Sequence, residues 1–522
     1  MQPTAAPPPT GGDLVGVVFP RVPAAGGRRS TSATGQAVLA DAVRPVDPDL
    51  AAAVLAVRNW RSGYLEPYRR VTELAGTRPG AAAAIAAAGL ASVHERFRFA
   101  AAHEETSLAE AVESGAGPQI RSVRVQGRAA LAPGGLSVPY RGSRLDGDRL
   151  DRRLDGWLSA GTAEPSFAAA VRSVAAHPQW LDLRGTTVVV LGAGAEMGPV
   201  VSLLRWGAHV VAVDLPRPAV WERLIATARD SPGSLTVPVA APVDGDLSDG
   251  DLSDGDLADR DLAAAAGVDL RTDLAHLLRW LAALPGPFVL GNYVYADGAA
   301  HVRAAVAVDA LTEALLRRRD DVSLAFLATP TDAFVVPADA VADSAARYRR
   351  REPLHRAGRV VSAGRLFRPN YPGTLTLPDG SVGALNDALV PQQGPNYALA
   401  KRVQRWRALH ERVGGRLVSL NVAPATRTRS VLRNRALAAA YAGAHRFGVE
   451  VFDPSTSNTL MAALLVHDLR DPAALANPAV PLPDPAELFR QGANHGGLWR
   501  TAYEPRSVLG LAVALGMLQR GA

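Results

Sequence analysis

A short apolar run, a glycine-rich turn and a second apolar run constrain the fold of this chain more than any other feature. Residues 186–191 read Thr-Thr-Val-Val-Val-Leu, and residues 209–213 read His-Val-Val-Ala-Val. Short runs that are apolar throughout and rich in β-branched side chains are typical of strands buried on both faces. The turn Gly192–Gly198 and a helical stretch to Trp206 lie between them. The pattern predicts a strand, a tight turn, a helix and a second, parallel strand.

Strand and helix patterns keep alternating after this unit. Further strands are expected at 235–239, 287–291, 322–328 and 416–421, and helices at 217–229, 258–283, 298–319 and 395–413. Strands that alternate with helices of this length predict an α/β fold with a doubly wound parallel sheet, which is Rossmann-like.

The same pass along the chain predicts its organisation. Residues 1–12 are expected to be a disordered tail, and 13–180 an N-terminal accessory region of mixed or helical structure. The Rossmann-like domain is expected at 181–450. It is interrupted by a low-complexity acidic insertion at 244–262 and a longer one at 331–394, which is expected to carry structure or function of its own. Residues 451–522 are expected to complete or cover the domain with a strand and a helix at 449–465.

Composition excludes several classes of protein. Hydrophobic residues make up 48% of the 522 residues, which is enough for a large core, and there is no cysteine, so thiol chemistry and cysteine-bound metals are excluded. The chain has no apolar run long enough to span a membrane and no secretory signal at its start, so we expect a cytoplasmic protein without a membrane partner. The 56 basic and 50 acidic residues are interspersed, and no pair of histidines has metal-ligand spacing, so neither nucleic acid nor a bound metal is predicted.

Lys401 is the one lysine of the chain, and the other 55 basic residues are arginines. A position that stays lysine in so arginine-rich a chain indicates a need for a compact ammonium whose pKa can be adjusted. The residue before it is Ala400, so a phosphate-binding loop ending in Gly-Lys-Ser/Thr is excluded.

The glycine turn has the chemistry of a phosphate-binding turn. Gly192, Gly194 and Gly198 let the backbone approach a pyrophosphate, and the following helix offers N–H groups and a positive dipole end. Asp214 ends the next strand, where a carboxylate binds the adenosine ribose and repels a 2′-phosphate. NAD is therefore the predicted cofactor. NADP stays open because Arg217, three residues further on, is able to accept that phosphate.

Tyr397 and Lys401 stand four residues apart in the stretch Tyr-Ala-Leu-Ala-Lys. On a helix both side chains lie on one face. A cation near a phenol lowers its pKa, so that the phenol can exchange a proton with a carbonyl or alcohol near neutral pH. The pair therefore predicts a catalytic site, with a surface tyrosine beside a basic residue as the alternative.

In these features the chain resembles the short-chain dehydrogenase/reductase superfamily over about 185–450. The turn Gly192–Gly198 has the family's first-to-last glycine spacing, although Glu196 stands at the usual middle glycine. Asp214 ends the second strand, and Tyr397 with Lys401 forms the Tyr-x-x-x-Lys signature.

The resemblance extends to two loops that line the cofactor site in the family. Asn292 follows the fourth strand, and the last strand runs into a loop that resembles the family's Pro-Gly loop, with Ala425 in place of the glycine. The resemblance therefore implies cofactor contacts from Asn292, Pro424, Thr426 and Thr428.

The family's remaining catalytic positions differ here. Its serine follows the fifth strand, where this chain has Thr329 and Thr331, and Ser381 in the long insertion is the rival. The resemblance implies that one of these hydroxyls holds the reacting oxygen. The family's asparagine on the fourth helix corresponds to Asp309.

The resemblance implies an NAD(P)-dependent oxidoreductase that acts on a carbonyl or alcohol, which is a small molecule or is bound to a carrier. Related folds use the same Tyr–Lys pair for epimerisation or dehydration with retained NAD, so that activity is an alternative. A non-catalytic nucleotide-sensing or scaffold protein is another. A homodimer is the association that the resemblance allows.

Overall fold

The computed structural model describes residues 15–521, apart from 24–25, 102–103, 115–118, 132–133, 241–257 and 483–484. The tail expected at 1–12 and most of the acidic insertion expected at 244–262 lie outside these residues. The fold described below is that of the remaining chain.

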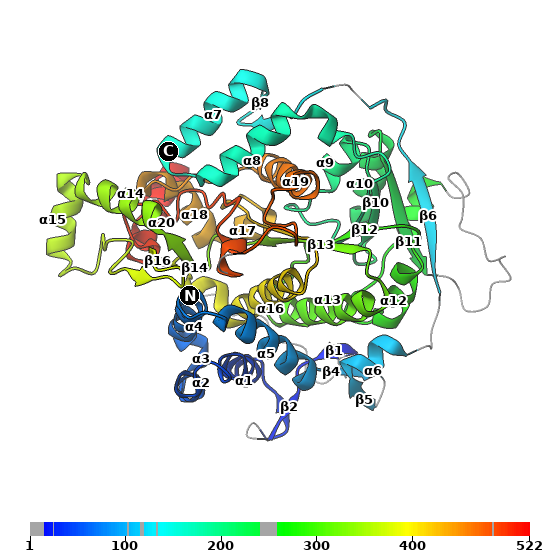
Figure 1. Cartoon of the computed structure of the whole chain (residues 1–522), viewed down its shortest axis with the longest axis horizontal. Coiled ribbons are helices and arrows are strands. Elements are labelled where there is room, and N and C mark those ends of the chain that lie inside the picture. The colour runs from blue at the N-terminus through cyan, green and yellow to red at the C-terminus, as the bar shows by residue number, and fades with distance from the viewer. Residues whose placement is uncertain are drawn as a thin grey trace.

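A seven-stranded sheet forms the centre of the molecule (Figure 1). Its order is β17-β13-β12-β9-β10-β11-β6. The strands are β9 (Thr187–Leu191), β10 (His209–Val213), β11 (Ser234–Ala240), β12 (Phe288–Asn292), β13 (Val322–Ala328), β17 (Val418–Val422) and β6 (Ile120–Gln126). The first six are parallel to their neighbours, and β6 pairs antiparallel with β11 at the edge. The direction in which strands are added reverses between β9 and β12.

The sheet separates two hydrophobic cores because its side chains alternate between the faces. Along β9, Val189 and Leu191 lie in one core, whereas Val188 and Val190 lie in the other. Both faces of the strand are therefore dry, which explains why it is apolar throughout rather than alternating.

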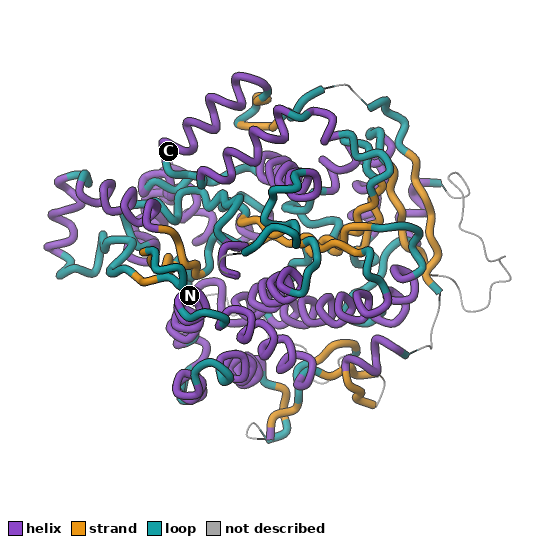
Figure 2. Tube along the Cα trace, viewed as in Figure 1, coloured by secondary structure: helices purple, strands orange, loops and turns teal. Residues whose placement is uncertain are grey.

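Helices cover both faces, and Figure 2 shows the strands as a layer between them. One face is covered by α12 (Leu274–Ala282), α13 (Ala299–Arg318) and α16 (Gly394–Val413), and the other by α8 (Pro165–Ala176), α9 (Val200–Arg205), α10 (Pro218–Arg229) and α19 (Pro454–Arg470). The predicted α/β class, with a mostly parallel sheet, is confirmed.

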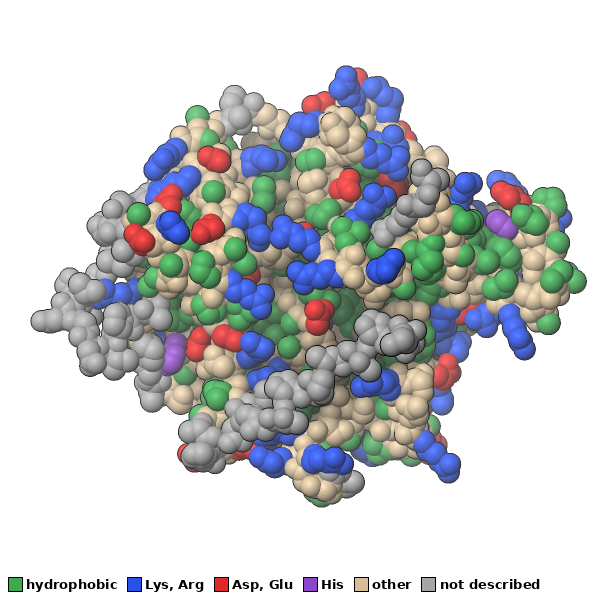
Figure 3. Space-filling model, turned by 180° about the vertical axis from the view of Figure 1, so that it is seen from behind, with side chains coloured by type: hydrophobic (Ala, Val, Ile, Leu, Met, Phe, Trp, Pro, Cys, Tyr) green, Lys and Arg blue, Asp and Glu red, His purple; other side chains and the backbone are tan. Residues whose placement is uncertain are grey.

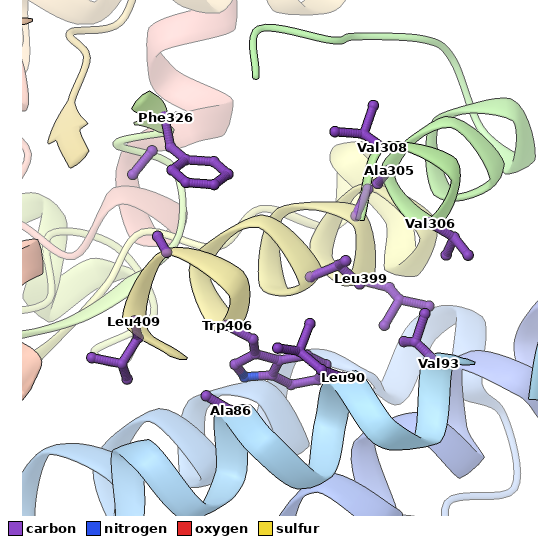
Figure 4. Packing of buried hydrophobic residues seen from close by; sticks show 14 of the residues in the cluster. Ala86, Leu90, Val93, Ala305, Val306, Val308, Phe326, Leu399, Trp406 and Leu409 are labelled. Atoms are coloured by element: carbon purple, nitrogen blue, oxygen red, sulfur yellow. The ribbon is translucent and has the colours of Figure 1, made fainter. Parts of the chain in front are cut away.

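The N-terminal region joins the central sheet as well as covering it. Its β6 is the seventh strand, and its helix α5 packs along α16 (Figure 4). The remaining elements before β9 are β1 (Gly16–Val18), β2 (Arg21–Val22), β3 (Arg28–Arg29), α1 (Thr31–Val43), α2 (Pro48–Leu55), α3 (Trp60–Gly63), α4 (Leu65–Thr77), α5 (Ala81–Arg96), β4 (Arg98–Ala101), β5 (Glu104–Ser107), α6 (Leu108–Glu113), β7 (Val138–Tyr140), β8 (Ser143–Leu145), α7 (Gly147–Ala160) and η2 (Pro178–Leu181).

The long insertion has structure of its own, as expected. It contains the three-stranded sheet β14-β16-β15. Its elements are β14 (Ala333–Pro337), α14 (Ala338–Arg349), α15 (Pro353–Val361), β15 (Leu375–Thr376), β16 (Val382–Asp387) and η3 (Pro391–Gln393). The C-terminal part adds α17 (Arg429–Arg433), α18 (Arg435–Gly443), η4 (Ala444–Phe447), η5 (Pro485–Phe489) and α20 (Pro505–Gly521).

Two expected elements differ in the structure. The helix expected over 258–283 is divided into α11 (Asp259–Ala265) and α12, because Gly267 adopts φ +117° and passes against the backbone of Pro216. The strand expected near 449 is reduced to a single bridge between Phe452 and Thr426. Within the described chain, no helix combines the length and the apolar character needed to cross a membrane.

The packing of α5 on α16 gives a prediction about two helical glycines. A Cβ on Gly89 of α5 would lie 2.6 Å from the Trp406 ring, whereas a Cβ on Gly156 of α7 would meet nothing closer than an Arg153 nitrogen at 3.8 Å. We expect Gly89→Ala to lower the free energy of unfolding by about 1–3 kcal/mol through overpacking. Gly156→Ala should instead raise it by about 0.5–1 kcal/mol. Urea unfolding of both variants checks the contrast, and equal effects would contradict this packing.

Candidate functional site

The candidate site lies at the carboxyl edge of the parallel sheet. The glycine turn follows β9, Asn292 ends β12, Thr329 follows β13, and the loop containing Pro424 follows β17. Because these strands are neighbours and run in the same direction, their ends meet at one edge. Helix α16 brings Tyr397 and Lys401 against this edge from the side of β13 and β17.

The phenol of Tyr397 meets the hydroxyl group that follows β13. Thr329 is its hydrogen-bonding side chain. The Oγ1 atoms of Thr329 and Thr331 are 2.9 Å apart, and Gln393 Nε2 donates to Thr331 Oγ1 at 2.5 Å. The structure therefore brings three predicted catalytic residues together, and Gln393 is a fourth polar group that sequence reasoning missed.

Lys401 is held by a short chain of amides. Its Nζ donates to Gln404 Oε1 at 3.0 Å, and Gln404 Nε2 donates to Asn292 Oδ1 at 3.3 Å. Gln404 is one helical turn beyond Lys401 and is buried, as is Asn292. The predicted cofactor residue Asn292 is thus connected to the predicted catalytic lysine through a glutamine that the family pattern does not indicate.

Burial dominates the electrostatics of the pair. Burial lowers the pKa of Lys401 to about 8, although the negative charge of Asp332 acts to raise it. It raises the pKa of Tyr397 above its ordinary value, and the hydrogen bond from Thr329 only partly offsets this effect. The expectation that the lysine lowers the tyrosine pKa is therefore wrong for this conformation, because the ammonium turns toward Gln404.

An aromatic box that sequence reasoning missed surrounds the Tyr397 ring. The His301 ring centroid lies 5.4 Å from that of Tyr397 and 5.2 Å from that of Tyr295. Tyr295 comes from the loop after β12 and donates to Asp297 Oδ1 at 2.9 Å. The box therefore joins the β12 loop to the first turn of α13 and to α16.

His301 is the unusual member of this box. It is 1% exposed, and neither ring nitrogen forms a hydrogen bond of good geometry with a described residue; the polar group beside the ring is the backbone of Val294. Burial and the nearby Lys401 charge lower its pKa to about 3, so the imidazole is neutral. Buried polar atoms without well-formed hydrogen bonds are costly, and a role in binding or catalysis is one explanation for keeping them. No spacing rule marked this histidine, since it stands alone in the sequence.

The glycine turn is closed by bonds within the protein. Gly192 adopts φ +80°, and its N–H and that of Ala193 donate to Val213 O. Gly194 N donates to Asp214 Oδ2 at 2.7 Å, while Asp214 Oδ1 accepts from Leu215 N at 2.8 Å. The turn and the acid are adjacent, as the sequence predicts, but the carboxylate is bound to the turn itself.

Glu196 connects the turn to the loop beyond β17. Its Oε2 accepts from the Arg429 N–H at 2.6 Å, and its Oε1 lies 3.0 Å from Arg429 Nε. Gly198 ends the turn, with its N–H bonded to Ala195 O. The carboxylate of Glu196, which the resemblance aligns with a glycine, is therefore neutralised by an arginine.

Arg223, rather than Arg217, bonds the backbone of this turn. Arg223 Nη2 donates to Gly194 O at 3.1 Å from the exposed side of α10. Arg217 is the N-cap residue of that helix and is exposed. Arg217 was expected because it is close to Asp214 in the sequence. In the fold, α10 instead places Arg223 over the turn.

The hydroxyls of the loop after β17 bind neighbours within the C-terminal part. Thr426 Oγ1 donates to Pro424 O at 2.8 Å and lies 2.7 Å from Ser457 Oγ. Thr428 caps α17, and its Oγ1 is 2.9 Å from Ser430 Oγ. This loop reaches the site beside Glu196, and Thr428 is the more accessible of its two threonines.

Ser381 and Asp309, which the sequence compared with catalytic positions, lie outside the site. Ser381 is exposed on a hairpin turn, where its Oγ donates to Asp379 Oδ1 at 2.6 Å, so it is not the rival hydroxyl. Asp309 is buried in a two-bond pair with Arg407 at 2.8 and 2.9 Å, and His94 Nε2 lies 2.7 Å from its Oδ2. Asp309 is thus part of an ion-pair network on the outer side of α13. His94, Asp309 and Glu313 have the spacing of metal ligands, but Arg407 already neutralises the aspartate.

No protein-family model and no curated protein sequence matches this chain. Its function must therefore be argued from the site itself.

The single lysine allows a direct test of the site's electrostatics. Protein labelled with ¹³C at the lysine ε-carbon gives one side-chain signal, which belongs to Lys401. We expect this signal to titrate with a midpoint of about 8 in the folded protein, and near the ordinary value of 10.5 in urea. Because the unfolded chain then binds the proton more tightly between these values, stability should rise with pH across that window. A folded-state midpoint near 10.5 would contradict the burial of this ammonium.

Proposed function

We propose that the protein is an NAD(P)-dependent oxidoreductase that acts on a carbonyl or alcohol, as a divergent relative of the short-chain dehydrogenase/reductases. The observation that carries the proposal is the contact between the Tyr397 phenol and Thr329, with Lys401 one turn away on α16. A phenol, a hydroxyl and an ammonium in this arrangement are the groups that proton transfer to a carbonyl oxygen requires.

The strand order supports a Rossmann-like interpretation. Counted along the chain, the six parallel strands lie in the order third, second, first, fourth, fifth and sixth, with β9 beside β12 at the reversal. Ligands of open α/β sheets bind at the carboxyl ends of the strands where the order reverses. The glycine turn and Asn292 follow these two central strands.

A nicotinamide cofactor, when bound, would supply the hydride chemistry of the proposed reaction. Tyr397 gives a proton to the carbonyl oxygen, or takes one from the alcohol. Thr329 orients the phenol and the reacting oxygen, with Thr331 and Gln393 fixing its hydroxyl. Lys401 lies one helical turn away with its ammonium on Gln404, and its lowered pKa lets it change protonation near neutral pH.

The proposed site has a nicotinamide end and an adenosine end, and its residues fit the first better than the second. The nicotinamide end of the cofactor is polar, and the groups that suit it are Lys401, Asn292 and the ring nitrogens of His301. At the adenosine end, Asp214 already accepts from Gly194 N–H, so binding of a ribose exchanges this bond for one to a hydroxyl. Asp214 favours NAD, while Arg223 beside it offers a cation to the 2′-phosphate of NADP.

A binding titration with NAD, NADH, NADP and NADPH tests the cofactor assignment. We expect micromolar binding, tighter for NAD than for NADP, that Gly194→Val abolishes because a side chain there meets Val220 and Asp214. Gly134→Val is the matched control, since a Cβ at Gly134 meets nothing within 4 Å. Tyr397→Phe should bind the same cofactors normally and lose about 10²–10⁴-fold in kcat on whichever carbonyl of a panel is reduced. Absence of binding by all four cofactors would contradict the proposal.

Substitution of His301 should raise the stability of the protein and lower its activity. His301→Leu removes two buried polar atoms that lack hydrogen bonds of good geometry, so we expect the free energy of unfolding to rise by about 1–3 kcal/mol. The same change should lower kcat, because the imidazole contacts the Tyr397 ring in the proposed pocket. Thermal melts and steady-state kinetics measure the two effects. An unchanged kcat would show that His301 only fills space.

Two observations favour a second function, a nucleotide-binding protein without turnover. The turn carries the Glu196–Arg429 pair where the resemblance has a glycine, and Asp309 is held by Arg407 outside the site. On this alternative Tyr397→Phe binds NAD normally, and the wild type shows no activity on any carbonyl. The titration and the carbonyl panel above distinguish the two functions.

A further inference from the structure

A projecting arm of the long insertion has a surface that the proposed oxidoreductase activity does not use. We define the arm as residues 349–365, which contain the end of α14 and all of α15. In Figure 1 the arm extends from the side of the molecule, beyond β14 and β16. No side chain of α15 is buried.

The arm carries most of the chain's excess charge. It contains six arginines (349, 350, 351, 356, 359 and 365) and one acidic residue, Glu352, so its net charge is +5, whereas the whole chain is +6. None of the six forms an ion pair with a carboxylate of the described residues. At its base, by contrast, Arg347 pairs with Asp343 and Arg368 with Glu504. The positive charge of the arm is thus both concentrated and uncompensated.

The same arm exposes its apolar side chains. Leu354 is 74% exposed, Val360 80% and Val361 88%, and these are the three most exposed of the large aliphatic side chains of the described chain. Figure 3 shows hydrophobic side chains gathered at this projecting end, with arginines beside them. Aliphatic side chains gathered at one place on a projection indicate a surface that becomes covered.

The outward direction of these side chains is fixed by packing on the inner side. The His355 ring stacks on Phe367 at 4.5 Å, and its Nδ1 lies 2.8 Å from the Tyr503 hydroxyl. A Cβ at Gly358 would lie 2.7 Å from the Phe367 ring, so the helix presses directly on that ring. Polar and small residues therefore face the body, and the aliphatic residues face away from it.

We propose that the arm binds the surface of an anionic lipid bilayer, with its aliphatic side chains in the interface and its arginines on the headgroups. A projecting, convex tip fits a flat and deformable surface, whereas a protein partner would need a matching hollow. Nucleic acid would satisfy the guanidinium groups but leave the aliphatic tip in water. Apolar residues on an exposed helix, with arginines on that helix and on its flanks, are the combination that binds membrane interfaces.

This inference revises the expectation that the protein has no membrane partner, and it does not depend on the oxidoreductase proposal. That expectation used charges averaged over the chain and the lack of a spanning segment. Surface binding requires neither a spanning helix nor a high overall charge. It requires local charge within a Debye length of the lipid, which is what the arm provides.

Co-sedimentation of the full chain with phosphatidylcholine vesicles, with and without phosphatidylserine, tests the proposal. We expect binding only with phosphatidylserine, and a decrease as salt is raised. Two arm variants are compared with two control variants. The arm variants are R349S/R350S/R356S and L354S/V360S/V361S, and the controls are R61S/R149S/R152S and L55S/V413S, at exposed positions outside the arm.

The arginine variant should bind about 100-fold more weakly, since each arginine near an anionic surface contributes to affinity. The aliphatic variant should also lose binding, and both controls should bind as the wild type does. All substituted residues are on the surface, and circular dichroism and thermal melts verify folding. No sedimentation with anionic vesicles would overturn the proposal, as would equal binding by the arm variants. Binding to duplex DNA that the arginine variant alone loses would assign the arm to nucleic acid instead.

Discussion

The structure depends on how helix α16 buries its charges between the sheet and the N-terminal helices. Four of its arginines are under a tenth exposed, and each is bonded: Arg402 and Arg405 share Asp332, Arg407 binds Asp309, and Arg412 donates to backbone carbonyls of residues 475, 477 and 480. A buried charge without a partner is strongly destabilising, so these pairs are a condition for the helix to lie where it does. Lys401, on the same helix, donates to an amide oxygen instead.

This difference between the lysine and its neighbouring arginines connects the fold to the proposed chemistry. An arginine stays charged and fills its site with bidentate bonds, whereas a lysine next to an amide can lose its proton. The ion pairs of α16 therefore hold the helix rigidly, and they leave one cation of adjustable charge near Tyr397. Asp309 belongs to these ion pairs, which is why it lies outside the candidate site.

The sequence predicted the elements whose signals are local. These elements are the apolar strands, the glycine turn and the spacing of Tyr397 and Lys401. They could be predicted because each depends on a few neighbouring residues. The sequence did not predict that Ile120–Gln126 would complete the sheet, since pairing with β11 joins segments over a hundred residues apart. His301, Gln404 and Arg223 were missed for the same reason, as their roles arise only when the strand ends meet. The charge averaged along the chain also gave no sign of the basic arm. The structure identifies it, because the arginines of the arm have no carboxylate partners among the described residues.

The most direct test of the account follows the signal of the single lysine while cofactor is added. In the proposed complex the Lys401 ammonium lies beside the nicotinamide, so saturating NAD should shift the ¹³Cε resonance and move its titration midpoint. The same addition to Gly194→Val should leave the resonance in place. If NAD binds, as reported by tryptophan fluorescence, and the lysine resonance does not move, Lys401 does not face the cofactor and the account is wrong.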